Sequence, residues 1–238
     1  MLKINYEYIK KESPVTLVFL HGWGQSGNSF NKIINYISSN NSILKLDLPG
    51  FGLSEEPKDY FDTQEYAYQI FLLLNKLSIK NVILIGHSFG GRLSILLASV
   101  YDINVEHLIL TSSAGLNKFN LFRWLKIKKY KLVKWLVEHN ILNKKSLNKY
   151  GSRDYRNSNN NLKVVMTKIV NQDLRKFAKK ISAKTLLVWD KKDKETRYWI
   201  CKKLRRYIEN SKIIVFKNGG HFTAFKNANK FSNIITNI

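Results

Sequence analysis

Short apolar, β-branched runs alternate with helical patterns along most of the chain, and this rhythm constrains the fold more than any other feature. We expect strands at 15–20, 42–46, 81–85, 107–110, 185–189 and 213–216. Helices are expected at about 62–77, 90–100, 195–208 and 227–235. The first of them begins at a capping box formed by Asp62 and Glu65. The sequence therefore predicts an α/β protein with a mostly parallel, doubly wound sheet.

The alternation of strand and helix patterns stops in the segment between the fourth and fifth of these strands. Residues 116–180 are helical in pattern and hold 18 Lys or Arg against 3 Asp or Glu. We therefore expect a core built from 1–115 and 181–238, with 116–180 inserted as a helical cap.

One stretch of this insertion has the spacing of a single helix face. Leu132, Trp135, Leu136 and His139 recur at i, i+3, i+4 and i+7. We expect this face to pack onto the core below it. A basic amphipathic helix lying on a membrane is the alternative.

Composition narrows the class of protein. Hydrophobic residues make up 44% of the 238 residues, which is enough for a buried core and argues against wholesale disorder. No apolar run is long enough to span a membrane, and residues 1–6 lack the apolar core of a signal peptide, so we expect a cytoplasmic protein. Cys201 is the single cysteine, which excludes an internal disulfide and a cysteine metal cluster.

The net charge of +23 has two interpretations. It is compatible with a nucleic-acid or membrane-surface partner. We favour compositional drift, because Lys, Asn and Ile are abundant throughout and no stripe interleaves basic with aromatic residues. We therefore expect salt-sensitive adhesion to polyanions and no specific nucleic-acid partner; the sequence does not give the oligomeric state.

The pattern G-x-S-x-G occurs at Gly86–Gly90, between an apolar strand and a helix. This is the context of a nucleophile elbow, in which a strained turn presents the serine at a helix N-terminus. Glycines are needed there because side chains would collide with neighbouring backbone. The sequence predicts Ser88 as a nucleophile.

If the Ser88 nucleophile attacks an acyl group, the carbonyl oxygen becomes an oxyanion that needs hydrogen-bond donors. Backbone N–H groups are the stiffest donors available. The turn His21–Gly24 ends an earlier strand, so the N–H groups of Trp23 and Phe89 are the expected pair. We expect His21 to bond the loop rather than act as a base, and His87 to pack under the elbow.

A histidine base is expected late in the chain. His221 follows Gly219-Gly220 after the last strand. The order Ser, Asp, His along the chain is the one found when such a site is built on a parallel α/β sheet, and it differs from the order in other serine hydrolases. Asp190 and Asp193 both follow the preceding strand, and Asp193 is the better candidate for the acid. Asp154 and Asp173 fall in the insertion and are weaker candidates.

Together these motifs resemble the α/β-hydrolase superfamily, in its group of small bacterial serine hydrolases with a helical cap. The resemblance rests on H-G-x-G at His21–Gly24, D-x-P-G-x-G-x-S at Asp47–Ser54, the elbow at Gly86–Gly91, the acid loop and the G-G-H loop. Two features depart from the usual acid loop: Asp190 stands where relatives carry glycine, and no proline follows.

The resemblance implies a hydrolase that acts through an acyl-enzyme, with a carboxylic ester or related acyl compound as substrate and no metal or organic cofactor. Carbon–carbon bond hydrolysis of the meta-cleavage type is an alternative, and a non-catalytic ligand receptor is another. Arg92 is similar to an arginine near the elbow of the menaquinone-pathway lyase of this fold. Otherwise we expect it to pair with solvent or a carboxylate.

Overall fold

The computed structural model describes residues 1–117, 121–147 and 150–238, with the backbone alone for 121–124, 126–127, 144 and 153. Within these residues it contains a sheet of seven strands in the order β1-β3-β2-β4-β5-β6-β7. The strands are β1 (Tyr6–Ile9), β2 (Val15–Leu20), β3 (Ser42–Leu46), β4 (Asn81–His87), β5 (Asn104–Thr111), β6 (Lys184–Trp189) and β7 (Ser211–Val215). Strand β1 pairs antiparallel with β3, and every other neighbouring pair is parallel.

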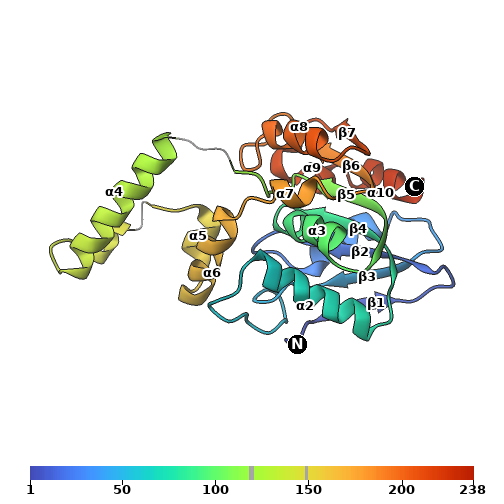
Figure 1. Ribbon diagram of the computed structural model, residues 1–238, viewed down its shortest axis with the longest axis horizontal. Helices are drawn as coiled ribbons and strands as arrows, with labels where there is room; N and C mark the ends of the chain where they lie inside the picture. The colour runs from blue at the N-terminus through green and yellow to red at the C-terminus, as the bar shows by residue number, and fades with distance from the viewer. Residues whose placement is uncertain (118–120, 148–149) are drawn as a thin grey trace.

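Helices connect the strands and cover the sheet (Figure 1). In chain order they are α1 (Asn31–Ile34), α2 (Thr63–Lys76), α3 (Phe89–Val100), α4 (Leu121–Glu138), α5 (Arg153–Asn157), α6 (Asn160–Asn171), α7 (Arg175–Ala178), α8 (Tyr198–Tyr207), α9 (Thr223–Lys226) and α10 (Ala228–Thr236). Three 3-10 turns accompany them: η1 (Gly27–Phe30), η2 (Lys144–Leu147) and η3 (Gly220–Phe222).

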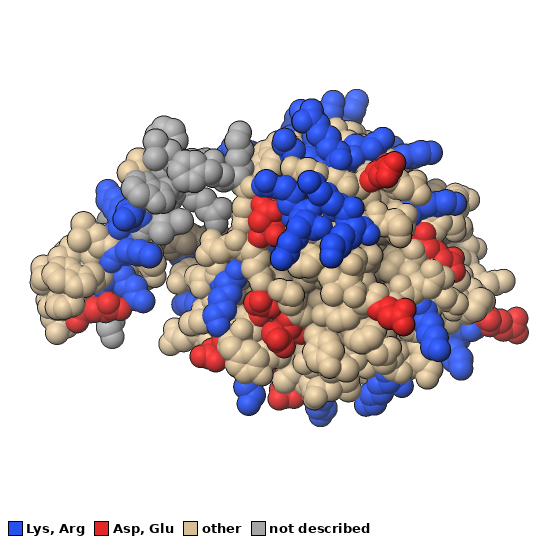
Figure 2. Space-filling view, in the orientation of Figure 1, with Lys and Arg blue, Asp and Glu red and all other residues tan. Residues whose placement is uncertain are grey.

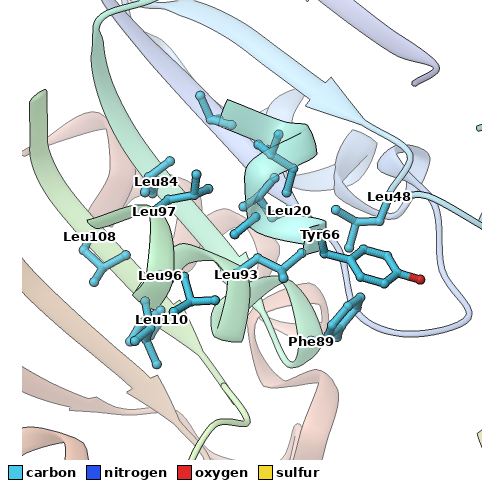
Figure 3. Close-up of a cluster of buried hydrophobic side chains, with 14 of the residues drawn as sticks. Leu20, Leu48, Tyr66, Leu84, Phe89, Leu93, Leu96, Leu97, Leu108 and Leu110 are labelled. Carbon is cyan, nitrogen blue, oxygen red and sulfur yellow. The ribbon is translucent and has the colours of Figure 1, made fainter. Parts of the chain in front are cut away.

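The core has two halves because successive side chains of a strand point to opposite faces of the sheet. Along β2, Val18 and Leu20 join the cluster that packs against α2, α3 and α8, whereas Leu17 and Phe19 join the cluster on the side of α1 and α10. Figure 3 shows the first cluster, where the rings of Tyr66 and Phe89 lie against each other beside the leucines of α3. The prediction of a doubly wound α/β fold is confirmed.

All six expected strands are present, with ends that differ by a few residues at most. Helix α2 begins as expected, since the Asp62 side chain accepts hydrogen bonds from the N–H groups of Gln64 and Glu65. Strand β1 was not expected. It lies at the edge of the sheet with largely exposed side chains, so it carries no apolar run that would mark it.

The insertion between β5 and β6 contains α4 to α7, and α6 is one of its parts that pack onto the core. Leu162, Val165 and Ile169 of α6 are buried in the core cluster. Arg92 on α3 is 4% exposed and donates to the carbonyl oxygens of Ile169 at 2.6 Å and Gln172 at 2.5 Å. Within the described residues, Arg92 therefore pairs with backbone carbonyls rather than with solvent or a carboxylate, and its charge satisfies oxygens at the C-terminal end of α6.

Helix α4 differs from the expectation. Figure 1 shows it projecting away from the sheet, and its face is not packed onto the core. Leu132 is 58% exposed and Trp135 49% exposed, and the Trp135 ring lies tilted against the ring of His139. The spacing of these residues correctly gives a shared helix face, but spacing alone does not determine what that face meets. No helix within the described ranges has both the length and the apolar character needed to cross a bilayer.

Candidate active site

The predicted elbow lies between β4 and α3, as its sequence context indicates. Ser88 precedes the first residue of α3 and has φ 49° and ψ −107°, a conformation that non-glycine residues adopt only when the surroundings enforce it. The surroundings here are backbone hydrogen bonds. Ser88 N–H donates to the carbonyl of Thr111, and the Ser88 carbonyl accepts from the N–H groups of Arg92 and Ala114.

The glycines of the elbow are required by close backbone approach. A Cβ at Gly90 would lie 2.0 Å from the carbonyl oxygen of Leu20, and a Cβ at Gly86 would lie 2.7 Å from the carbonyl oxygen of Gly90. Both distances are far inside van der Waals contact. The turn therefore brings Ser88 to the sheet edge where β2 ends, next to the loop that begins at His21.

His221 and Asp193 also lie at the carboxyl ends of the parallel strands, after β7 and β6 respectively. His221 Nδ1 is 3.0 Å from Asp193 Oδ2, and both side chains are buried. Burial opposes ionisation of Asp193, but hydrogen bonds from His221 and Thr196 and the charge of the imidazole outweigh it, so the pKa of Asp193 is lowered. The structure thus brings together the predicted base and the preferred acid.

Asp190 has a different set of partners. Its Oδ2 accepts hydrogen bonds from the N–H groups of Gly219 and Gly220, each at 2.8 Å, and its Oδ1 accepts from Lys192 N–H. Burial opposes ionisation of this carboxyl, but these N–H donors outweigh it and lower the pKa of Asp190. Asp190 therefore holds the loop that carries His221, and within the described residues it makes no hydrogen bond to the imidazole. Asp173 pairs with Arg175 and Asp154 lies in α5, and neither forms an ion pair with His221 within the described residues.

Sequence reasoning missed two residues that surround His221. Thr196 Oγ1 lies 2.8 Å from Asp193 Oδ2, 2.9 Å from the carbonyl oxygen of Ser112 and 3.2 Å from His221 Nδ1. The sequence feature that could have identified Thr196 is its position three residues after Asp193. Asp193 Oδ1 accepts hydrogen bonds from the N–H groups of Glu195 and Thr196 in a local turn. The hydroxyl therefore helps to fix the carboxylate and the imidazole relative to each other.

Glu195 is the second missed residue. Its carboxylate Oε2 lies 3.4 Å from His221 Nε2, and its side chain is 60% exposed. Among the described residues, no hydrogen bond joins Ser88 Oγ to His221. Such bonds are often long before substrate binds. A hydrogen bond between Ser88 Oγ and His221 Nε2 thus requires the imidazole or the hydroxyl to move, in competition with the Glu195 carboxylate.

The predicted oxyanion donors are the N–H groups of Trp23 and Phe89. Neither N–H donates a hydrogen bond within the described part of the chain, whereas the adjacent Gly90 N–H donates to the carbonyl of His21. The loop of Trp23 is fixed by Gln25, whose Oε1 accepts from Gly22 N–H and lies 3.2 Å from His87 Nδ1. Gln25 was not predicted, because a glutamine in a loop carries no local pattern.

His21 and His87 have the structural roles expected of them. His21 Nδ1 lies 2.7 Å from the carbonyl oxygen of Gly22, and its Nε2 accepts from Leu48 N–H. His87 lies beneath the elbow, with Nε2 3.1 Å from the carbonyl oxygen of His221. Burial is the main cause that lowers the pKa of His21 to about 4 and that of His87 to about 3.

We expect these two histidines to make the fold sensitive to acid. Both have a folded pKa below the value of 6.5 for an unburied imidazole, so the unfolded chain binds more protons as the pH falls. The stability they contribute is present above pH 6.5 and is lost below it. From pH 7 to pH 5 the free energy of unfolding should fall by about 2 kcal/mol for each histidine.

Urea denaturation at pH 7 and pH 5 measures this loss. The His87→Gln variant is the control, because it should remove about half of the pH dependence whatever it does to stability at pH 7. A free energy of unfolding that stays constant between the two pH values would contradict the buried, neutral state of both imidazoles.

The side chain of Trp23 connects the site to the insertion. Its indole ring lies against Phe51 and Phe89, and its Nε1 donates to Ser158 Oγ at 3.1 Å. The segment between α5 and α6 therefore touches Trp23, whose backbone N–H is one of the two predicted oxyanion donors. The aromatic residues Trp124 and Trp135 of the insertion predict an apolar roof over the site, but the side chain of Trp124 lies outside the described residues.

Comparisons with known proteins agree with this architecture. A model of the alpha/beta hydrolase fold family matches residues 15–136, which is more than half of the chain. The AB hydrolase superfamily protein YisY of Bacillus subtilis (strain 168) is 26% identical, and the match covers 96% of this chain and 97% of that protein.

Two solved structures share the fold at low sequence identity. An esterase from Exiguobacterium antarcticum has a TM-score of 0.76 at 21% identity and covers 99% of this chain and 95% of its own. A meta-cleavage product hydrolase from Pseudomonas fluorescens has a TM-score of 0.70 at 18% identity and covers 99% and 93%. Sheet order, elbow and family match lead to one conclusion: the chain belongs to the α/β-hydrolase family.

Proposed function

We propose that this α/β hydrolase is a serine hydrolase that cleaves carboxylic esters through an acyl-enzyme. One observation carries the proposal: a strained Ser88 at the N-terminus of α3 shares a sheet edge with the buried His221–Asp193 pair. The three residues follow β4, β7 and β6, and the carboxyl ends of parallel strands are where such sites assemble. The expected substrate is a small acyl compound.

In the first half-reaction Ser88 Oγ attacks the ester carbonyl carbon while His221 Nε2 takes the hydroxyl proton. The carbonyl π electrons move to oxygen, where the N–H groups of Trp23 and Phe89 stabilise the negative charge. Collapse of the tetrahedral intermediate breaks the bond to the alkoxy oxygen, and His221 returns its proton to the leaving alcohol. Asp193 keeps the imidazole proton on Nδ1 and stabilises the imidazolium that forms.

The second half-reaction repeats these steps with water. His221 Nε2 takes a proton from water as its oxygen attacks the acyl carbon, and the same two N–H groups bind the oxyanion. Collapse releases the carboxylic acid and returns the proton to Ser88 Oγ. Water serves as the co-reactant, and the residues named are sufficient for the proton balance.

We also propose that residues 116–180 act as a cap over the core formed by 1–115 and 181–238. The supporting contacts are the Trp23–Ser158 hydrogen bond and the burial of α6 against the core. A cap of this kind governs which acyl chains and alcohols reach Ser88 rather than the chemistry itself.

Carbon–carbon bond hydrolysis is the second candidate, and the meta-cleavage product hydrolase of the same fold favours it as an alternative. The same serine, histidine and oxyanion donors would serve, with a carbon leaving group in place of the alcohol. A receptor that binds a ligand without turnover is a third possibility, which the buried, hydrogen-bonded His221–Asp193 pair argues against.

A panel of p-nitrophenyl esters from acetate to laurate tests the proposal. We expect turnover with at least one ester, and a burst of p-nitrophenol equal to the enzyme concentration where deacylation is slow. Turnover of a vinylogous diketone with no turnover of any ester would favour carbon–carbon hydrolysis. Saturable binding of esters without any product would favour a receptor.

A further inference from the structure

We propose that a basic cavity between α7 and α8 binds a small molecule that carries an oligophosphate group. The cavity has a volume of about 480 Å³ and is lined by Leu116, Asn117, Arg175, Trp199, Lys202, Lys203, Arg206 and Tyr207. None of Ser88, Asp193 and His221 lines it. The proposed site is therefore separate from the proposed catalytic residues, and the inference does not rest on ester hydrolysis.

One face of α8 forms the charged wall of this cavity. Trp199, Lys202, Lys203 and Arg206 stand at i, i+3, i+4 and i+7, so they project from the same side of the helix. The opposite side, with Cys201 and Leu204, is buried in the core. The packing of α8 therefore fixes the direction in which its cations point.

The charge on this face is strongly positive. Helix α8 has four Lys or Arg residues and no acidic residue. In the part of the chain that the structure describes, no carboxylate lies within ion-pair distance of Lys202, Lys203 or Arg206. Like charges at i, i+3 and i, i+4 repel each other, and an anion in the cavity would relieve that repulsion.

Arg175 supplies a cation from the other wall, at the start of α7. Its position is fixed by Asp173, which accepts from the Arg175 guanidinium at 3.1 Å and from Asn117 N–H at 3.0 Å. A shallower depression that shares Arg175 is lined by Asp173, Lys176 and Lys179. Figure 2 shows Lys and Arg gathered over α7 and α8, although the chain is basic throughout.

The chemistry of the lining indicates the ligand class. Guanidinium groups match phosphate oxygens with paired hydrogen bonds, and lysines serve as point charges for phosphate. Four cations around one cavity suit a ligand with several negative charges better than a single carboxylate does. The half-buried rings of Trp199 and Tyr207 add a flat apolar surface, on which the base of a nucleotide could stack.

Compositional drift explains the number of lysines in the chain but not why several of them line one cavity. The test therefore compares a variant that loses positive charge at the cavity with one that loses the same charge elsewhere. The cavity variant is Lys202→Gln/Lys203→Gln/Arg206→Gln. The control variant, Lys10→Gln/Lys76→Gln/Lys80→Gln, removes the same charge from exposed positions around β1 and α2. Ligands are tripolyphosphate, ATP and a DNA duplex, titrated by calorimetry at 150 mM salt. All six substituted side chains are exposed, so both variants should fold.

We expect wild-type protein to bind tripolyphosphate or ATP saturably, with a dissociation constant below about 100 µM. The cavity variant should bind at least about tenfold more weakly, and the control variant within about twofold of wild type. Tighter binding of ATP than of tripolyphosphate would identify a nucleotide as the source of the oligophosphate, and equal binding would identify a free oligophosphate. Equal weakening in both variants, absence of saturable binding, or a preference for DNA that the cavity variant leaves intact would overturn the proposal.

Tryptophan fluorescence locates the ligand independently. Because Trp199 lines the cavity, binding of ATP should change the emission, and the change should be largely lost in Trp199→Phe. An unaltered fluorescence response in Trp199→Phe would place the ligand elsewhere and contradict the assignment.

Discussion

Replacing Asp193 by asparagine is expected to lower kcat/KM for the best ester by about four orders of magnitude. The carboxylate Oδ1 accepts from two backbone N–H groups, so the amide oxygen of asparagine will keep that position. The amide NH₂ will then face His221 Nδ1 and force it to accept a hydrogen bond. The imidazole proton moves to Nε2, and Nε2 can no longer take the proton of Ser88.

Asp190→Asn is the matched control, since it makes the same chemical change three residues away. Asp190 holds Gly219 and Gly220 rather than the imidazole, so we expect a loss of about tenfold together with some loss of thermal stability. A greater loss of kcat/KM in Asp190→Asn than in Asp193→Asn would move the acid to Asp190. Mild and equal losses would mean that either carboxylate can serve as the acid or that the acid lies on another loop.

Ser88→Ala is expected to fold normally and to lose at least about three orders of magnitude in kcat for ester hydrolysis. Ser88 Oγ has no recorded hydrogen bond within the described residues, so its removal leaves no buried partner unsatisfied. The positive φ is as unfavourable for alanine as for serine, and the backbone bonds that enforce it do not involve the side chain. Residual activity would come from the oxyanion donors alone.

Ser113→Ala controls for a general effect of serine removal at this edge of the sheet. Ser113 is buried, follows β5 and donates its hydroxyl to the carbonyl of Ala114. Its loss should change kcat by no more than about threefold. Comparable activity in Ser88→Ala and Ser113→Ala would remove Ser88 from the reaction.

The sequence predicted the parts of this protein that depend on local backbone requirements. The elbow could be located because Gly86 and Gly90 tolerate no side chain at contacts of under 3 Å. The strands could be located because parallel strands are buried on both faces and read as continuous apolar runs. The edge strand β1 lacks such a run, because it meets the sheet on one side alone.

Residues that act across long sequence separations could not be predicted in the same way. Gln25 reaches His87 and Thr196 reaches Ser112, contacts that span 62 and 84 residues and follow from the arrangement of loops in space. For helix α4, the sequence predicted the helix face but not what that face contacts. Its apolar spacing was evident, but whether Leu132 and Trp135 meet the core depends on how the insertion is connected.

Ser88 is the proposed nucleophile that becomes acylated, and a fluorophosphonate, which phosphonylates an activated serine, labels such a residue for mass spectrometry. Trypsin releases residues 81–92 between Lys80 and Arg92, a peptide in which Ser88 is the single residue with a hydroxyl group. We predict a one-to-one adduct on this peptide in wild-type protein and none in Ser88→Ala. An adduct on a different peptide, or labelling that persists unchanged in Ser88→Ala, would contradict the account.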